Sequence, residues 1–229
     1  TNVMKVFAGD TESMIDPDTG RHDTCMLVIK GVYRDDIEIR SNLWTNKNVV
    51  RDGMIEFMKK YNKWLVEEIT KKRPDKVSEK KWEKFVSLCK SLQNPTSKQI
   101  ANLHEKLKIP ISDTGFKELR EPIIYFHHLG YDVQPFLCTF APKTKTTAIK
   151  KGAVWYRTSF ACKYGCFELR NSLTIITTAL RNFPKMFLPK EEQNKMIKEV
   201  YAYDAINKHL LEYRKDTRPG FWVTLDTLH

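Results

Sequence analysis

One stretch decides the fold that we predict for this chain: Tyr125-Phe126-His127-His128-Leu129-Gly130-Tyr131-Asp132. It continues a short apolar run, Pro122-Ile123-Ile124, so that Ile123–Phe126 is typical of a buried strand. The chain is then expected to turn at Gly130 into a short helix. A carboxylate is thereby placed at the end of a cluster of aromatic and histidine side chains.

A second acidic pair lies far upstream, after residues 3–9. Those residues are apolar and β-branched enough for a buried strand, which is expected to end in Asp10-Thr11-Glu12. On a straight strand Asp10 and Glu12 point to the same face, about 7 Å apart. Residues 25–29 predict a second buried strand and residues 36–40 a third, edge-like strand, which together make an antiparallel meander.

Apolar residues at helical spacing begin near residue 49. They predict a long amphipathic helix over residues 49–72. A lysine-rich helical insertion follows at about 74–121, with helices expected over 79–92 and 97–107. Between these two helices, Asn94-Pro95-Thr96-Ser97 offers a helix cap.

The last third of the chain mixes both kinds of element. Residues 142–147 predict a basic loop, and residues 153–161 and 166–170 predict a hairpin that turns at 163–165. Helices are expected over 173–183, 190–200 and 204–214. We therefore predict one mixed α/β domain over residues 1–229, with a mixed central sheet flanked by helices.

Composition narrows the class of partner. The chain has 229 residues and a formal net charge of +11, which favours a polyanionic partner, nucleic acid before an anionic membrane. The alternative is lysine on solvated faces. No apolar run approaches the ~20 residues that cross a bilayer. Five scattered cysteines favour a reducing, intracellular compartment over a secreted disulfide scaffold.

The acidic side chains suggest metal-dependent cleavage of a phosphodiester. Asp10, Glu12 and Asp132 are candidate ligands for two ions, and hard oxygen ligands favour Mg²⁺ or Mn²⁺ over zinc. Tyr125, His127 and Tyr131 are candidates for stacking on unpaired bases. The alternatives remain a solvated turn at Asp10 and Glu12 and ordinary core or surface roles for the aromatic and histidine residues. Lys143 and Lys145 either contact phosphates or lie in a solvated loop.

The ordered motifs resemble a known family. Residues 6–12 are similar to the first exonuclease motif of protein-primed family B DNA polymerases of bacteriophages, viruses, linear plasmids and Polinton-like elements. Residues 125–132 are similar to the second motif, Tyr-Phe-His-Asn-Leu-x-Phe-Asp. Residues 167–173 resemble the downstream Asp-Ser-Leu element, and residues 201–204 resemble the Phe-Pro-Tyr-Glu element after it. The resemblance spans about residues 3–207.

This resemblance implies an RNase H-like 3′–5′ exonuclease acting on single-stranded DNA. It implies that Asp10, Glu12 and Asp132 are the catalytic metal ligands. The residues that it implies along the nucleic-acid strand are Tyr125, His127, His128, Tyr131, Ser172 and Leu173. Besides nucleic acid, the expected partner is a polymerase domain or a larger complex.

The chain departs from the family pattern at several points. His128 stands in place of Asn and Asn171 in place of Asp, the latter expected to change packing more than catalysis. The third motif, Tyr-x-x-x-Asp, is not found, and no polymerase domain is expected within residues 1–229. A captured, inactive relative that serves as a nucleic-acid-binding or scaffold subunit, even of a ribonucleoprotein, therefore remains an alternative. A basic protein-interaction module is a third.

Overall fold

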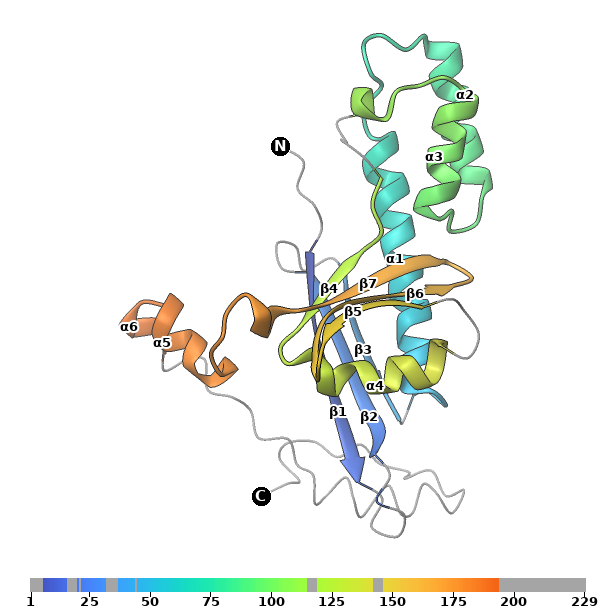
Figure 1. The fold of residues 1–229 in the computed structure, drawn as a ribbon. Helices are drawn as coiled ribbons and strands as arrows, with labels where there is room; N and C mark the ends of the chain where they lie inside the picture. Colours follow the sequence, from blue (N-terminus) through green and yellow to red (C-terminus); the bar gives the residue numbers. More distant parts are fainter. Residues whose placement is uncertain are drawn as a thin grey trace.

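A seven-stranded mixed sheet forms the centre of the protein in a computed structural model (Figure 1). The structure describes residues 6–15, 20, 22–31, 37–43, 45–114, 119–141 and 146–193. The strand order is β3-β2-β1-β4-β7-β6-β5, with β1, β4 and β7 parallel and the other neighbours antiparallel. The strands are β1 Val6–Ile15, β2 His22–Gly31, β3 Glu38–Asn42, β4 Ile123–Phe126, β5 Thr147–Lys151, β6 Val154–Cys162 and β7 Gly165–Asn171. The predicted mixed α/β class is confirmed.

The first strand is longer than its apolar residues suggest. We expected it to end at the acidic pair, but β1 continues to Ile15, so Asp10 and Glu12 lie within the strand. The reason is pairing: β2 accompanies β1 over nearly its whole length, with Asp10 opposite Val28, and the register shifts only after Glu12. The expected meander is present, and β3 is the edge strand at that end of the sheet.

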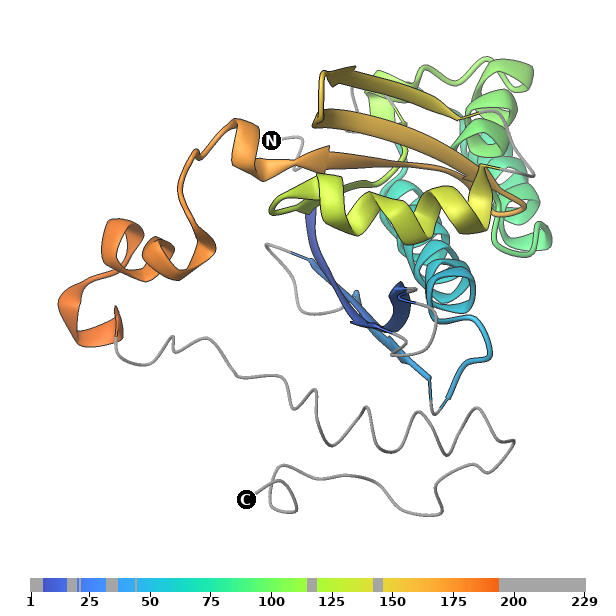
Figure 2. The ribbon, with the colours of Figure 1, turned by 60° about the horizontal axis from the view of Figure 1, so that its bottom comes forward.

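Two helices cover one face of the sheet. α1 (Val49–Thr70) contacts β2 and β3, and α4 (Leu129–Phe140) lies along β6 and β7 (Figure 2). Phe7 of β1 packs edge-on against Phe57 of α1 at 4.8 Å between ring centroids. The strand register puts Phe7 beside Ile124 of β4, on the same sheet face. This face forms the core, and its fully buried aromatic side chains include Phe126 and Phe136.

Between α1 and β4 the chain builds a helical lobe, which we define as residues 71–114. It contains α2 (Glu79–Ser91), α3 (Ser97–Lys106) and the 3₁₀ turn η1 (Ile111–Thr114). Thr96 starts α3 with a capping box, because its side chain accepts from the Gln99 backbone while the Gln99 side chain accepts from the Thr96 backbone. Figure 1 shows the lobe at the end of α1, away from most of the sheet.

The segment after β7 contradicts one prediction. The helix expected over 173–183 is wrong: the chain forms the 3₁₀ turns η2 (Ser172–Thr174) and η3 (Leu180–Asn182). The β-branched run at residues 174–178 disfavours a helix there. α5 (Phe183–Phe187) begins after them, with Pro184 in its first turn, and α6 (Lys190–Gln193) follows. The rest of the helix expected over 190–200 and the whole of 204–214 lie outside the described residues.

The order of elements is compatible with an RNase H-like fold: an antiparallel meander, a helix, a parallel strand, a second helix and a further parallel strand. The hairpin of β6 and β7 turns at Lys163 and Tyr164 as expected, whereas β5 was not predicted. Among the described residues, no helix is long and apolar enough to span a membrane.

Candidate functional site

The two acidic motifs meet at the point where β4 ends. β4 pairs with β1 only as far as Gly9 opposite Phe126, so the backbone of β1 beyond Gly9 lacks this neighbour. α4 begins there and brings Asp132 to the exposed strand edge. The Asp132 Oδ1 atom accepts hydrogen bonds from the Thr11 backbone N at 3.2 Å and from the Thr11 Oγ1 at 2.6 Å. Asp132 is thus fixed beside the residue that separates Asp10 from Glu12.

The three candidate ligands differ in exposure. Asp132 is 7% exposed, Glu12 is half-buried and Asp10 is exposed. The pKa of Asp132 is raised to about 6 in total: burial raises it most, the hydrogen bond from the Thr11 hydroxyl lowers it, and the charge of Asp10 raises it. The effect of Asp10 means that its carboxylate lies close enough to Asp132 for the two charges to repel.

The chemistry of this acidic pair fits a hard divalent cation such as Mg²⁺ or Mn²⁺. A cation near Asp10 and Asp132 would favour the charged form of both carboxylates and relieve their repulsion. Within the described ranges, however, no group of three or more His, Cys, Asp or Glu side chains is arranged to hold a metal ion. A centre that also includes Glu12 therefore stays a prediction.

Buried side chains pack closely over the residue before Asp10. Gly9 directly precedes it, and a Cβ atom built on Gly9 would lie 2.5 Å from Cζ of Phe126 and 2.9 Å from Cγ2 of Ile124. Both of those side chains are fully buried. The glycine therefore leaves room for the side chains of Phe126 and Ile124 to pack over β1 just before the acidic pair.

Aromatic and histidine rings lie next to the acidic residues. Tyr131 is 67% exposed, and its ring centroid is 6.1 Å from that of His22 and 6.4 Å from that of His128. His128 precedes α4 with a φ of 73°, in the left-handed region. Asn and His are among the non-glycine residues that adopt this conformation most readily. The exchange of Asn for His at this position is therefore compatible with the backbone.

His127 has a structural role that the sequence did not indicate. Its Nδ1 is 3.1 Å from Ser172 Oγ and its Nε2 is 2.8 Å from the Thr178 carbonyl oxygen. Its ring also contacts Phe183 edge-on at 5.2 Å. These contacts hold the start of the segment after β7 against the β4–α4 turn. Ser172 and Leu173 are both half-buried there.

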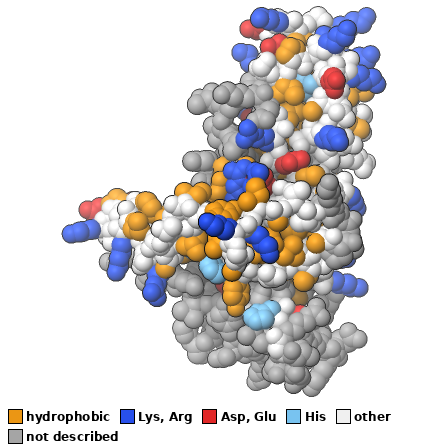
Figure 3. Space-filling view, viewed as in Figure 1, with side chains coloured by type: hydrophobic (Ala, Val, Ile, Leu, Met, Phe, Trp, Pro, Cys, Tyr) orange, Lys and Arg blue, Asp and Glu red, His pale blue; other side chains and the backbone are white. Residues whose placement is uncertain are grey.

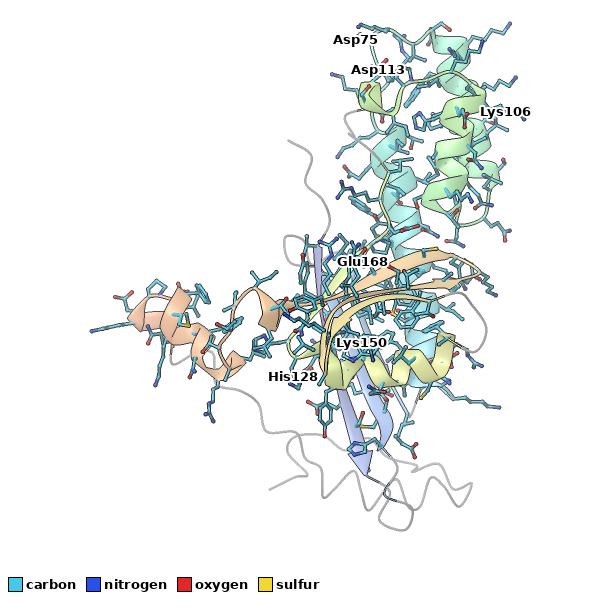
Figure 4. All side chains as sticks on the ribbon, in the orientation of Figure 1. Asp75, Lys106, Asp113, His128, Lys150 and Glu168 are labelled. Atoms are coloured by element: carbon cyan, nitrogen blue, oxygen red, sulfur yellow. The ribbon has the colours of Figure 1, made fainter. Side chains whose placement is uncertain are left out.

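Tyr125 lies on the other face of the sheet from the helices. The register aligns Ala8, Tyr125 and Arg170 across β1, β4 and β7, and Ala8 shares its face with Asp10 because side chains alternate along a strand. The Tyr125 hydroxyl accepts from Arg170 Nη1 at 3.4 Å. Arg170 in turn pairs with Glu168, labelled in Figure 4, at 2.5 Å. Tyr125 is therefore on the same sheet face as Asp10.

Asn171 is buried and links three backbone segments through its side-chain amide. It is 5% exposed, and its Oδ1 accepts from the backbone N of Leu129 at 3.4 Å and of Leu173 at 3.1 Å. Its Nδ2 donates to the Trp155 carbonyl oxygen at 2.8 Å. Because a carboxylate has no proton to donate to that carbonyl, an amide suits this position better than the Asp of the resembling motif.

Several predicted residues are not placed. Lys143 and Lys145 lie outside the described residues, as do residues 201–204. The sequence did not single out Thr11, although its position between two candidate ligands was a signal.

No model of a known protein family matches the chain, and neither does any curated protein or solved structure.

Proposed function

We propose that this chain is a 3′–5′ exonuclease domain of the kind found in protein-primed family B DNA polymerases, acting on single-stranded DNA. The observation that carries the proposal is the pair of hydrogen bonds from Thr11 to Asp132. These residues are 121 positions apart, and each lies within one of the two motifs on which the resemblance rests. Their contact supports a common site.

In this proposal Asp10 and Asp132 hold divalent cations, with Glu12 as the expected third ligand. Such cations stabilise the charge that develops on the phosphodiester during hydrolysis. The protein contributes position: the backbone and hydroxyl of Thr11 fix one oxygen of Asp132, and the short β4 leaves the edge of β1 accessible to α4. Because the pKa of Asp132 is about 6, its carboxylate is charged near neutral pH.

The surrounding rings suit a single strand better than a duplex. Unpaired bases stack on aromatic side chains with little sequence preference. The exposed ring of Tyr131, with His128 and His22 beside it, offers such a surface next to Asp132. Tyr125, His127, Ser172 and Leu173 remain proposed contacts, as do the two loop lysines, Lys143 and Lys145.

The test is a trimming assay with a 5′-labelled oligonucleotide. With Mg²⁺ or Mn²⁺ the wild-type chain is expected to give a ladder of products shortened one nucleotide at a time, and a blocked 3′ end should prevent it. Asp10→Asn should reduce the rate at least a hundredfold, on the order of 3 kcal/mol of transition-state stabilisation. The matched control is Asp75→Asn, an exposed acidic residue in the helical lobe. Equal rates in the two variants would refute the proposed site.

A second candidate is an inactive relative that binds nucleic acid or serves as a scaffold subunit. It is favoured by the lack of a three-ligand group among the described residues. It predicts that the chain binds single-stranded DNA or RNA without shortening it, whichever divalent cation is added. Under this candidate Asp10→Asn would leave binding unchanged and there would be no cleavage to lose.

A further inference from the structure

The helical lobe carries more than half of the net charge of the protein. Residues 71–114 contain eleven lysines and arginines and five acidic residues, a net charge of +6 out of +11. Ten of the eleven cations are exposed, and Lys81 is half-buried. Within the described part of the chain, Lys71 is the only one in an ion pair with a carboxylate, at 3.6 Å from Glu68. Figure 3 shows Lys and Arg side chains spread over the helical lobe, at the top of the view.

One face of α2 presents two of these cations together with two hydroxyl groups. Lys80, Lys84, Ser87 and Ser91 follow one another at three- and four-residue intervals, so they form one exposed stripe along the helix. The buried side of the same helix consists of Trp82, Phe85 and Cys89. Amine and hydroxyl groups are the side chains that bind phosphate oxygens in nucleic-acid backbones.

We propose that the helical lobe binds double-stranded nucleic acid through its phosphate backbone, without reading its sequence. The charge complements a duplex, which carries one negative charge per about 1.7 Å of its axis. Single strands require stacking surfaces, and the lobe offers none. Its two aromatic residues other than histidine, Trp82 and Phe85, are 8% and 0% exposed, and its histidine, His104, is 1% exposed.

The same composition argues against a membrane surface. A helix that lies in the lipid interface needs large apolar side chains on its exposed side. None of the large hydrophobic residues that are exposed in the described part of the chain belongs to residues 71–114. The apolar side chains of the lobe instead pack inside it, as Trp82 does on Phe85 and Phe85 does on His104.

This surface is distinct from the site of the acidic residues. α1 has 22 residues, a length of roughly 33 Å, and the lobe is at its far end. In Figure 4, Asp75 and Lys106 mark the lobe, well separated from His128, which precedes α4. The lobe is thus placed to hold a duplex while a single-stranded end is bound elsewhere. Binding by the lobe does not depend on cleavage.

The experiment measures binding of a labelled 20-base-pair duplex, and of one of its single strands, by fluorescence anisotropy in EDTA at several salt concentrations. Lys80→Glu/Lys84→Glu reverses two charges of the stripe. Lys47→Glu/Lys63→Glu is the matched control, because it makes the same change in net charge at two exposed lysines outside the lobe. Should the reversed pair fold poorly by circular dichroism, Lys80→Gln/Lys84→Gln replaces it.

We expect the lobe variant to bind the duplex at least tenfold more weakly at low salt, with the slope of log K against log salt reduced by roughly 1.8 for two lost phosphate contacts. The control should lose less than about threefold. Equal losses in both variants, or binding to phosphatidylserine vesicles without binding to the duplex, would overturn the proposal. Asp10→Asn should keep full duplex affinity, so a failure of the exonuclease proposal and a failure of this one give different results.

Discussion

Asp132→Asn is expected to make the protein more stable while it abolishes trimming. Asp132 has a folded-state pKa of about 6 against its ordinary 3.8, which means that burial and Asp10 disfavour its charged form. The difference between these two pKa values corresponds to about 3 kcal/mol in the free energy of unfolding. Asparagine carries no charge, and its Oδ1 can still accept both hydrogen bonds from Thr11.

The gain depends on pH in a defined direction. Well below pH 3.8 Asp132 is protonated in both the folded and the unfolded protein, so it does not reduce the free energy of unfolding. As pH rises from 3.8 to 6 the unfolded protein loses the proton first, and the wild type becomes less stable relative to the variant. The advantage of Asp132→Asn should therefore reach about 1–3 kcal/mol at pH 8 and fall to about half of that at pH 5.

Urea unfolding followed by tryptophan fluorescence measures this difference. Thr11→Val is the companion variant: it removes the hydroxyl that donates at 2.6 Å and should cost about 2 kcal/mol. If Asp132→Asn is less stable than the wild type at pH 8, the carboxylate is stabilised as an anion by its surroundings. Asp132 would then be a structural link between α4 and β1 rather than a functional acid with a raised pKa.

Three further variants test the packing around the site and in the lobe, each by urea unfolding. Gly9→Ala should lower the free energy of unfolding by about 1–3 kcal/mol, because its Cβ would lie 2.5 Å from Cζ of Phe126. An unchanged unfolding midpoint would show that the side chains over Gly9 can move to make room for a methyl group. Asn171→Asp should cost about 2–4 kcal/mol at pH 8, since it loses the donor to the Trp155 carbonyl, and wild-type stability would contradict that role. Burial lowers the pKa of His104, so the stability that its neutral ring contributes should be complete above pH 6.5 and should fall below it. His104→Gln should remove this part of the pH dependence. Identical pH profiles of the wild type and the variant would argue against a buried neutral ring.

Local sequence signals were sufficient to predict an element where proline, polar or helix-capping residues mark its ends. β4 was predicted residue for residue, because an apolar run begins after Pro122 and ends at the polar histidines. α1, α2 and α3 were predicted to within a few residues, since each has a buried face at helical spacing and two of them start at a side-chain cap.

Elements that depend on distant partners were not predictable in this way. The second half of β1 contains few apolar residues and is a strand because β2 pairs with it. All residues of β5 are exposed, so no alternation of apolar and polar side chains marks it, and only its pairing with β6 makes it a strand. The segment after β7 is held by His127 across a separation of 45–51 residues.

For the site, the sequence identified acidic residues but not how they are held. The approach of Asp10 to Asp132 agrees with the motif order, whereas the convergence of Glu12 on the same ions remains a prediction. The role of Thr11 was not predicted because it depends on where β4 ends. β4 pairs with β1 only as far as Gly9, and this leaves the backbone N of Thr11 to donate to Asp132. Register of this kind is a property of the sheet and cannot be derived from either motif alone.

The central claim is that Asp10 and Asp132 share a divalent cation. The most direct measurement is the anomalous difference density of crystals soaked in Mn²⁺, compared between the wild type and Asp10→Asn. The account predicts a peak within coordination distance of both carboxylates, about 2.0–2.3 Å from the oxygens, which the variant lacks. A manganese-saturated wild type with no density between these two side chains would contradict it.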